Sequence, residues 1–397
     1  MIALLVAGCG MASETEVRLE DPEPLPLASA PGSMAPWLTT ASDGTVYLSW
    51  IEPDGDGHAL RFATYAPGAT GWSTPTTIAL GTRWFVNWAD TPSLTVDPEG
   101  TLTAHWLAYN GEGRYAYGVR VSRSTDGGQT WSTPVWLHDD DSPTEHGFVA
   151  LVPEASERVR ALWLDGRLFA RGKKQMTLRS RSIERDGVLT PEVVVDSLVC
   201  DCCPVQAVGL PGGAVLAVYR NRTREEIRDI WRVRFDGTRW EAPAPVHEDG
   251  WQIAGCPVNG PAVAARGDRV VVAWFTAAGG EPHVRVAFSG DAGRTFAEPL
   301  NLDLGQPTGR VDAVMLDDGS ALVTWIEATG EGEAAGIYAR QVGSDRRMGA
   351  PHLLVASTTS RAGGYPRLVR SGSELVLAWT EPGEASFVRT ARIRIET

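Results

Sequence analysis

The feature that most constrains the fold is a short strand ending in an aromatic residue, which recurs seven times along the chain. Successive copies are almost evenly spaced, and their aromatics are Trp50, Trp106, Trp163, Tyr219, Trp274, Trp325 and Trp379. Each copy is preceded by another short strand and a glycine-containing turn, and is followed by a strand that alternates apolar and polar residues. A unit repeated at such a regular period predicts an array of equivalent β modules rather than several unrelated domains.

A fourth strand in each unit is marked by a proline that follows the third strand. These prolines recur at nearly the same spacing as the aromatics, at Pro75, Pro134, Pro191, Pro243, Pro299 and Pro351. The pattern predicts an all-β protein, a β-propeller of four-stranded antiparallel blades, with seven blades as the leading count and six blades plus an irregular cap as the alternative. The seventh unit ends after its third strand, so we expect the N-terminal segment Glu16 to Glu20 to close the ring by covering that free edge.

Two turns between third and fourth strands match the Asp-box pattern S-x-D-x-G-x-T-W/F. The first contains Ser124, Asp126, Gly128 and Trp131, and the second contains Ser289, Asp291, Gly293 and Phe296. In such a turn the Asp accepts hydrogen bonds from the local backbone, the Gly takes a positive φ, and the aromatic fills space between blades. With its repeats, the chain resembles the sialidase superfamily, whose propellers include hydrolases, lyases, glycan binders and assembly factors. The resemblance therefore implies a fold but no single activity.

The charge of the chain argues against nucleic acid as a partner. The formal net charge is -13, and basic residues form no long run. A polyanion would be repelled by such a surface, so we expect a glycan, a peptide or a protein as the ligand of a monomeric propeller.

The N-terminus resembles a bacterial lipobox. Val6-Ala7-Gly8-Cys9 follows an apolar stretch, although eight residues precede the Cys and none of them is Lys or Arg. The resemblance implies that residues 1–9 are the remnant of a signal peptide and that Cys9 carries lipid. Residues 10–30 are then a linker with a possible closing strand, and the propeller occupies residues 31–397. No other segment approaches the roughly 18 apolar residues of a membrane span, so we expect the protein at the outer membrane, in the periplasm or on the cell surface of a bacterium, attached through lipid at Cys9 alone.

Ligands are expected on the face formed by the loops between second and third strands and between blades. The sialidase resemblance implies an arginine cluster for a substrate carboxylate, a tyrosine nucleophile and a carboxylic acid on this face. Our leading candidates are Arg83, Arg220, Arg310, Tyr365 and Asp312. Further candidates for the same roles are Arg361, Tyr109, Tyr115, Tyr117, Asp90 and Glu145. The arginine-isoleucine-proline motif typical of sialidase N-termini is absent, which counts against sialidase activity itself.

Four cysteines gather on two consecutive loops of the same face. Cys200, Cys202 and Cys203 lie in one loop, and Cys256 lies in the next. Two disulfides would suit an exported protein. The alternative is a thiolate site for copper or zinc, or a redox-labile disulfide, with His138, His146 or His247 as possible added ligands, and no other cofactor is expected.

Aromatic and basic residues beside the cysteines suggest ligand binding. Trp84, Trp88 and Trp251 could stack on a sugar or merely cap the channel. Arg222 and Arg224 could grip an anion, or they could belong to an internal ion-pair network with Glu225, Glu226 and Asp229. The sequence therefore predicts, first, a ligand- or partner-binding module that uses this Cys- and Arg-rich face. An exo-sialidase-type glycoside hydrolase is the alternative, and a metal or redox site is a third possibility.

Overall fold

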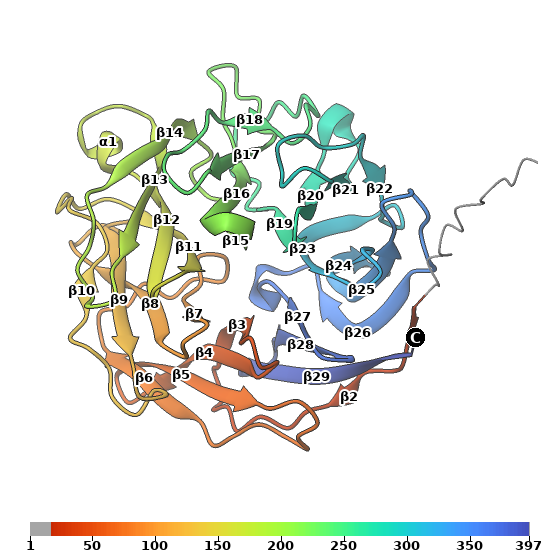
Figure 1. The fold of residues 1–397 in the computed structure, drawn as a ribbon, viewed down its shortest axis with the longest axis horizontal. Coiled ribbons are helices and arrows are strands. Elements are labelled where there is room, and N and C mark those ends of the chain that lie inside the picture. Colours follow the sequence, from red (N-terminus) through yellow and green to blue (C-terminus); the bar gives the residue numbers. More distant parts are fainter. Residues whose placement is uncertain (1–16, 397) are drawn as a thin grey trace, which may run out of the picture.

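The computed structural model describes residues 17–396 and shows a seven-bladed β-propeller (Figure 1). The seven innermost strands are β3 (Met34–Thr40), β7 (Ser93–Val96), β11 (His146–Glu154), β15 (Gln206–Leu210), β19 (Ala262–Arg266), β23 (Pro307–Met315) and β27 (Arg367–Ser371). The second strands are β4 (Val46–Asp54), β8 (Leu102–Tyr109), β12 (Arg158–Asp165), β16 (Ala214–Arg220), β20 (Arg269–Thr276), β24 (Ala321–Ala328) and β28 (Glu374–Glu381). The seven-blade prediction is confirmed, and the six-blade alternative is wrong.

The third and fourth strands complete each blade toward the outside. The third strands are β5 (Gly57–Tyr65), β9 (Tyr117–Ser124), β13 (Met176–Ile183), β17 (Ile230–Phe235), β21 (His283–Ser289), β25 (Ala334–Val342) and β29 (Phe387–Glu396). The fourth strands are β6 (Thr76–Gly81), β10 (Val135–Trp136), β14 (Val193–Val199), β18 (Ala244–Pro245), β22 (Leu300–Asn301) and β26 (His352–Thr358). Every pairing within a blade is antiparallel.

The N-terminal segment closes the ring, as the missing seventh proline predicts. Strands β1 (Arg18–Leu19) and β2 (Glu23–Pro24) both pair antiparallel with β29, the last strand of the chain. The Leu25 amide donates to the Thr390 carbonyl at 2.9 Å, and the Leu25 side chain is buried. The outer edge of blade seven is thus covered by backbone from the other end of the sequence, which removes an exposed strand edge.

The repeated aromatics form the core between blades. Trp50, Trp163, Trp274 and Trp325 have no exposed side-chain surface. The indole N–H of three of them donates to a carboxylate two residues later on the same strand face, at Glu52, Asp165 and Glu327. The repeat thus satisfies its buried indole donors locally, which lets a large aromatic serve in successive blades.

The two Asp-box turns are held by the same four hydrogen bonds. In the first, Ser124 Oγ donates to Asp126 and accepts from the Gly128 amide, while both the amide and the hydroxyl of Thr130 donate to the Asp126 carboxylate. Ser289, Asp291, Gly293 and Thr295 repeat these bonds. Trp131 and Phe296 are partly buried against the hydrophobic core.

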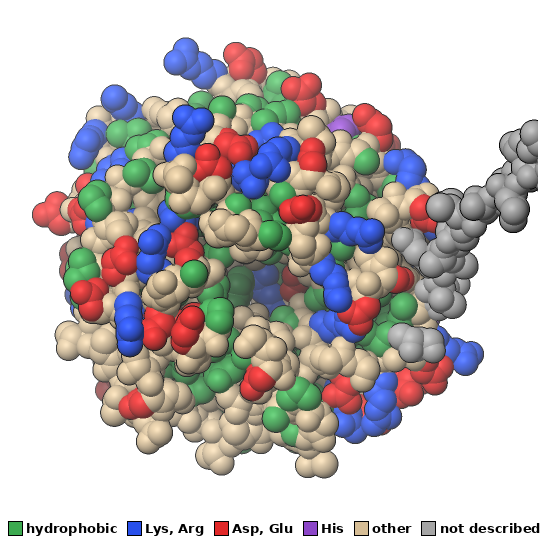
Figure 2. All heavy atoms as spheres, viewed as in Figure 1, with side chains coloured by type: hydrophobic (Ala, Val, Ile, Leu, Met, Phe, Trp, Pro, Cys, Tyr) green, Lys and Arg blue, Asp and Glu red, His purple; other side chains and the backbone are tan. Residues whose placement is uncertain are grey.

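Helix is confined to single turns in the described residues, the only α-helical turn being α1 (Arg167–Ala170). No helix within residues 17–396 is long and apolar enough to cross a membrane. Cys9 and the rest of the lipobox lie outside the described residues. The space-filling view shows a hollow at the middle of the ring (Figure 2).

Candidate functional site

A cavity of about 690 Å³, here called the ligand-face cavity, opens on the face that the repeats predict for ligands. Its walls come from the loops β6–β7, β8–β9, β10–β11, β12–β13, β14–β15, β18–β19 and β26–β27. These are second-to-third-strand and blade-to-blade loops, whereas the Asp-box turns join third to fourth strands at the opposite end of the ring. A larger cavity of about 1010 Å³ lies along the inner strands and their turns.

The ligand-face cavity contains a tyrosine hydroxyl held between two carboxyl groups. Tyr117 Oη lies 2.8 Å from Asp90 Oδ2 and 2.7 Å from Glu145 Oε1. A phenol has one proton to donate, so two bonds of this length require that one of the carboxyl groups carries a proton. Asp90 and Glu145 both occur just before an inner strand, in blades two and three. Their equivalent positions explain why the two acids meet.

Local backbone geometry fixes Asp90 in this arrangement. The Phe148 amide donates to Asp90 Oδ1 at 2.7 Å, and Phe148 takes a positive φ of 52° beside an irregularity in the β11–β12 pairing. Non-glycine residues seldom adopt that conformation, and such strain concentrates at functional sites. The Tyr117 ring stacks on Phe85 at a centroid distance of 3.8 Å. The hydroxyl therefore has little freedom to move.

Burial changes the acidity of all three groups. Desolvation raises the pKa of Asp90 to about 7, although the hydrogen bonds from Tyr117 and Phe148 oppose that rise. Desolvation likewise raises the pKa of Glu145 to about 8, and the nearby charges of Asp90, Asp201 and Cys256 add to it. The pKa of the Tyr117 phenol is also raised by burial and by the two acids. The carboxyl pair therefore shares a proton near neutral pH.

The predicted arginine cluster is not assembled. Arg220 is buried and donates to the backbone carbonyls of Arg228, Asn259 and Phe275. Arg310 is also buried and donates to the carbonyls of residues 359, 360 and 364. Both guanidinium groups hold loops together, because their donors already have protein acceptors. The expectation that they bind a substrate carboxylate is therefore not supported by the structure.

Among the described residues, Arg83, Tyr365 and Asp312 form no hydrogen bond or ion pair with Asp90 or Glu145, although the Tyr365 ring stacks on Trp88 at 5.9 Å. Arg83 is exposed and pairs with Glu112 at 3.6 Å. The Tyr365 hydroxyl is buried and donates to the Val258 carbonyl at 2.7 Å. Asp312 lines the larger cavity and accepts from the amides of residues 313 and 368. The leading five candidates are thus dispersed, and the second-choice residues Tyr117, Asp90 and Glu145 are the ones that meet.

Apolar and basic groups surround the carboxyl pair. Phe85, Trp88, Tyr115, Phe148 and Phe169 line the cavity. Among the described residues, Arg361 and Arg114 have no carboxylate partner; the Arg361 guanidinium carbon lies 5.7 Å from the Trp88 ring and that of Arg114 lies 5.6 Å from the Tyr115 ring. Sequence patterns did not single out Phe85, Phe148, Phe169 or Arg114.

Two of the three predicted tryptophans belong to the core instead. Trp84 packs on Trp106 at 5.8 Å, and Trp251 lies under the Arg220 guanidinium at 4.9 Å. Both are buried, so Trp88 is the one member of the trio that lines the cavity. Arg222 forms an ion pair with Glu226 at 2.5 Å, so it stabilises its own loop, whereas Arg224 is exposed.

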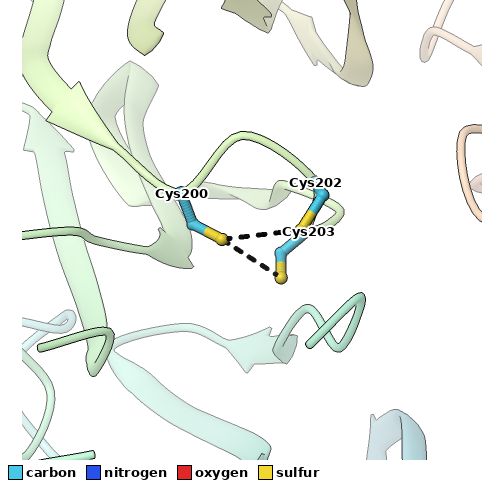
Figure 3. Close-up of side chains that lie close together, drawn as sticks. All are labelled: Cys200, Cys202 and Cys203. Carbon is cyan, nitrogen blue, oxygen red and sulfur yellow. Dashed lines mark hydrogen bonds between the residues drawn. The ribbon is translucent and has the colours of Figure 1, made fainter. Parts of the chain in front are cut away.

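The four described cysteines are free thiols, so the expected disulfides are not found in residues 17–396. Cys200 Sγ lies 3.8 Å from Cys202 Sγ and 3.6 Å from Cys203 Sγ, and the three side chains converge (Figure 3). Arg228 donates to Cys200 Sγ at 3.2 Å. Burial opposes ionisation of Cys200, but its hydrogen bonds with the other two thiols and the charges of Arg228 and Arg220 outweigh that effect, so the pKa of Cys200 is lowered.

The three candidate histidines lie apart from this cluster. His138 and His146 stack on each other at 3.9 Å, and His146 Nε2 is 3.2 Å from Asp140. His247 Nδ1 lies 2.9 Å from Asp249 Oδ1. Among the described residues, the groups able to hold a metal are Cys200, Cys202 and Cys203, and Asp201, Cys202 and Cys256. No histidine joins either group.

Comparison with known proteins supports the fold. No protein-family profile and no curated protein matches the sequence. Among solved structures, a protein of unknown function from Dyadobacter fermentans DSM 18053 is 14% identical with a TM-score of 0.57, over 96% of this chain and 99% of that one. The Hadza microbial sialidase Hz136 is 12% identical with a TM-score of 0.51, over 91% of this chain and 65% of that one.

The α-L-arabinofuranosidase Arb93A from Fusarium graminearum is 14% identical with a TM-score of 0.50, over 96% of this chain and 98% of that one. The chain therefore has a sialidase-like β-propeller fold. Identities this low show the fold alone.

Proposed function

We propose that this protein is a glycoside hydrolase whose reacting groups are Asp90, Glu145 and Tyr117. The observation that carries the proposal is the placement of one phenol between two proton-sharing carboxyl groups in an accessible cavity. Groups whose pKa values lie near 7 and 8 can exchange protons at neutral pH, which glycoside hydrolysis requires of its acid and base.

The position of Tyr117 between the acids favours retention of anomeric configuration. Because both carboxylate oxygens bond to the same phenol oxygen, at 2.8 and 2.7 Å, they lie at most about 5.5 Å apart. Inverting enzymes separate their carboxyl groups by about 6.5 to 9.5 Å to leave room for a water, and the separation here is too short for that. With its oxygen between the two acids, Tyr117 is the nucleophile that we assign, and a covalent intermediate follows from it.

Each group then has a distinct role in the proposed reaction. Glu145 is the more exposed acid and has the higher pKa, so it donates a proton to the leaving oxygen as the glycosidic bond breaks. The Tyr117 oxygen bonds to the anomeric carbon, and Asp90 accepts the phenol proton. Water then attacks the same carbon while Glu145 removes its proton, and Asp90 returns a proton to Tyr117. This base is needed because burial makes the phenol a poorer acid.

The cavity walls suit a sugar with an apolar face. Trp88 and the exposed Phe169 offer ring surfaces near the acids, and stacking on such rings is a common way to hold a pyranose or furanose. The predicted carboxylate grip of a sialidase is not supported, since Arg220 and Arg310 donate to backbone carbonyls. We therefore propose glycoside hydrolysis without assigning a sialic acid substrate.

The first experiment is turnover of a panel of 4-methylumbelliferyl glycosides by the full chain, including an α-sialoside and an α-L-arabinofuranoside. We expect hydrolysis of at least one, with kcat reduced by 100-fold or more in Asp90→Asn, Glu145→Gln and Tyr117→Phe. Arg83→Ala is the matched control, because Arg83 is exposed outside the cavity, and it should retain full rate. An activity that survives all three substitutions would exclude this site.

Mass spectrometry tests the covalent intermediate. An activated 2-fluoro glycoside of the cleaved sugar should add one sugar mass to the peptide that contains Tyr117. Labelling of a carboxylate peptide instead would contradict the nucleophile assignment. If isothermal titration calorimetry shows that a glycoside of the panel binds but no glycoside is hydrolysed, the chain is the ligand-binding module that the sequence first suggested.

The lipid anchor at Cys9 is part of the same proposal. Eight residues separate Cys9 from β1 at Arg18, and an extended chain spans about 3.3 to 3.6 Å per residue. The propeller would therefore stay within about 30 Å of the membrane. Incorporation of labelled palmitate, abolished by Cys9→Ser, is the expected result.

A further inference from the structure

Three cysteine sulfurs converge at the end of strand β14, beside the carboxyl pair but separate from it. Cys200, Cys202 and Cys203 place their sulfurs within 4.8 Å of one another, and two of the three separations are 3.6 and 3.8 Å (Figure 3). Cys200 and Cys203 are buried, and Cys202 is half-buried.

The surrounding backbone fixes this convergence. The Cys200 amide donates to the Arg220 carbonyl at 3.0 Å, which attaches the loop to strand β16. The Asn259 amide donates to Cys203 Sγ at 3.4 Å from the neighbouring blade-to-blade loop. Two sulfurs thus accept hydrogen bonds from different elements, the second donor being Arg228, which lies 3.2 Å from Cys200 Sγ. Donors aimed at the two sulfurs can also stabilise the thiolate form, which is the form that binds metals.

We propose that Cys200, Cys202 and Cys203 form a three-coordinate site for a soft monovalent metal ion, Cu(I). Thiolate ligands select soft ions. With metal–sulfur bonds of about 2.3 Å, a trigonal site requires sulfur separations of about 4.0 Å, close to the separations of 3.8 and 3.6 Å from Cys200 Sγ to the other two sulfurs. The proposal is independent of glycoside hydrolysis.

The number of sulfurs favours Cu(I) over Zn²⁺. Arg228 lies beside Cys200 Sγ, but it also pairs with Asp201 and Glu226, so the net charge of the surroundings does not select between the two ions. Structural zinc needs a fourth ligand, whereas Cu(I) is satisfied by three thiolates. Among the described residues, the remaining thiol, Cys256, groups with Asp201 and Cys202 rather than with all three sulfurs.

The ion has a route from solvent. Cys202 belongs to both metal-capable groups and lines the ligand-face cavity together with Asp201 and Cys256. Cys256 is exposed, so an incoming ion would meet it before the buried sulfurs. Cys256 is thus an entry residue and is not required in the final site.

The test is competition for Cu(I) against bicinchoninate, using the full chain with Cys9→Ser so that the four loop thiols remain. We expect one equivalent of Cu(I) to be withdrawn from the probe, and X-ray absorption to show three sulfurs at about 2.3 Å. Cys200→Ser and Cys203→Ser should each lower the affinity by 100-fold or more. Cys256→Ser is the matched control and should still bind one equivalent.

The melting temperature of Cys200→Ala separates loss of copper binding from loss of folding, because alanine is tolerated at a buried position. A variant that melts at the temperature of the parent protein but binds no Cu(I) has lost the site alone. Loss of copper in Cys256→Ser would overturn the three-sulfur assignment, and so would stoichiometric zinc with weak Cu(I) binding. Protein isolated with disulfides Cys200–Cys203 and Cys202–Cys256 and no reactive thiol would also overturn it.

Discussion

Gly147 lies so close to Asp90 that a Cβ atom at Gly147 would stand 2.0 Å from Asp90 Oδ2. The same atom would lie 2.9 Å from the Tyr117 ring. The bare glycine backbone therefore provides the space in which the buried carboxyl meets the phenol. A side chain could enter only if Asp90 gave up its bond to Tyr117 or to the Phe148 amide.

Gly147→Ala should consequently damage both stability and catalysis. We expect the free energy of unfolding to fall by about 1 to 3 kcal/mol, as for overpacked cores, and kcat to fall at least 10-fold. Urea unfolding and turnover measure the two effects. Gly290→Ala is the matched control, since a Cβ there meets nothing within 4 Å, and it should leave both quantities unchanged.

Activity should be highest at the pH where Asp90 and Glu145 together hold one proton. One proton resides on the pair between the pKa of Asp90, about 7, and that of Glu145, about 8. We expect a bell-shaped profile of kcat/KM with limbs near these values. The other ionisable groups that influence Glu145 are Tyr117, Asp201 and Cys256, so Cys256→Ser should lower the alkaline limb slightly. A flat profile from pH 6 to 9 would contradict the assignment.

The free energy of unfolding should decrease as the pH rises from the ordinary pKa values of the two acids to about pH 8. The ordinary pKa values of Asp90 and Glu145 are 3.8 and 4.5, and folding raises both. Above the ordinary values the unfolded chain has released protons that the folded protein still holds, so the free energy of unfolding falls with rising pH until about pH 8. Asp90→Asn removes one of these groups and should make the melting temperature less dependent on pH between 5 and 8.

The two predicted sialidase arginines Arg220 and Arg83 should behave oppositely. Arg220→Ala leaves several buried carbonyls without donors, so the free energy of unfolding should fall by about 3 kcal/mol or more. Arg83→Ala removes an exposed ion pair and should change it by less than about 0.5 kcal/mol. Thermal unfolding of both variants tests the assignment. If Arg220→Ala kept its stability and lost substrate affinity, the guanidinium would be a ligand group after all.

Ring closure gives a further prediction. Deleting residues 1–26 removes β1, β2 and the buried Leu25, whose burial alone is worth about 2 to 3 kcal/mol. The deletion also exposes the edge of β29, so we expect a lower melting temperature and concentration-dependent association in light scattering. Deletion of residues 1–16 keeps both strands and serves as the control. A monomer of unchanged stability after the longer deletion would contradict the role of these strands.

The repeat made the fold predictable because its markers are local. A repeated aromatic such as Trp163 marks the second strand of its unit, and the hydrogen-bond acceptor of its indole, Asp165, lies two residues later on the same strand. The prolines report the fourth strands in the same way, and the missing seventh proline pointed to the N-terminus. Blade number and closure therefore needed no knowledge of contacts between distant residues.

The site was harder to predict because each of its groups comes from a different blade loop. The sequence offers Arg220 and Tyr117 equally as site residues. In the structure Arg220 donates to backbone carbonyls, whereas the Tyr117 hydroxyl lies between two acids. The residues that flank them in the sequence do not reveal this difference. A usable signal did exist in the equivalent positions of Asp90 and Glu145, each just before an inner strand, where acids from neighbouring blades can meet.

The closure of blade seven also constrains how the chain must fold during synthesis. Strands β1 and β2 precede all other strands of the ring, yet their partner β29 follows them all. During synthesis these two strands therefore stay unpaired until β29 has been made, and contacts of such sequence separation form slowly. The first six blades are each built from consecutive strands and can pair as they emerge, but the ring itself cannot close until β29 is present.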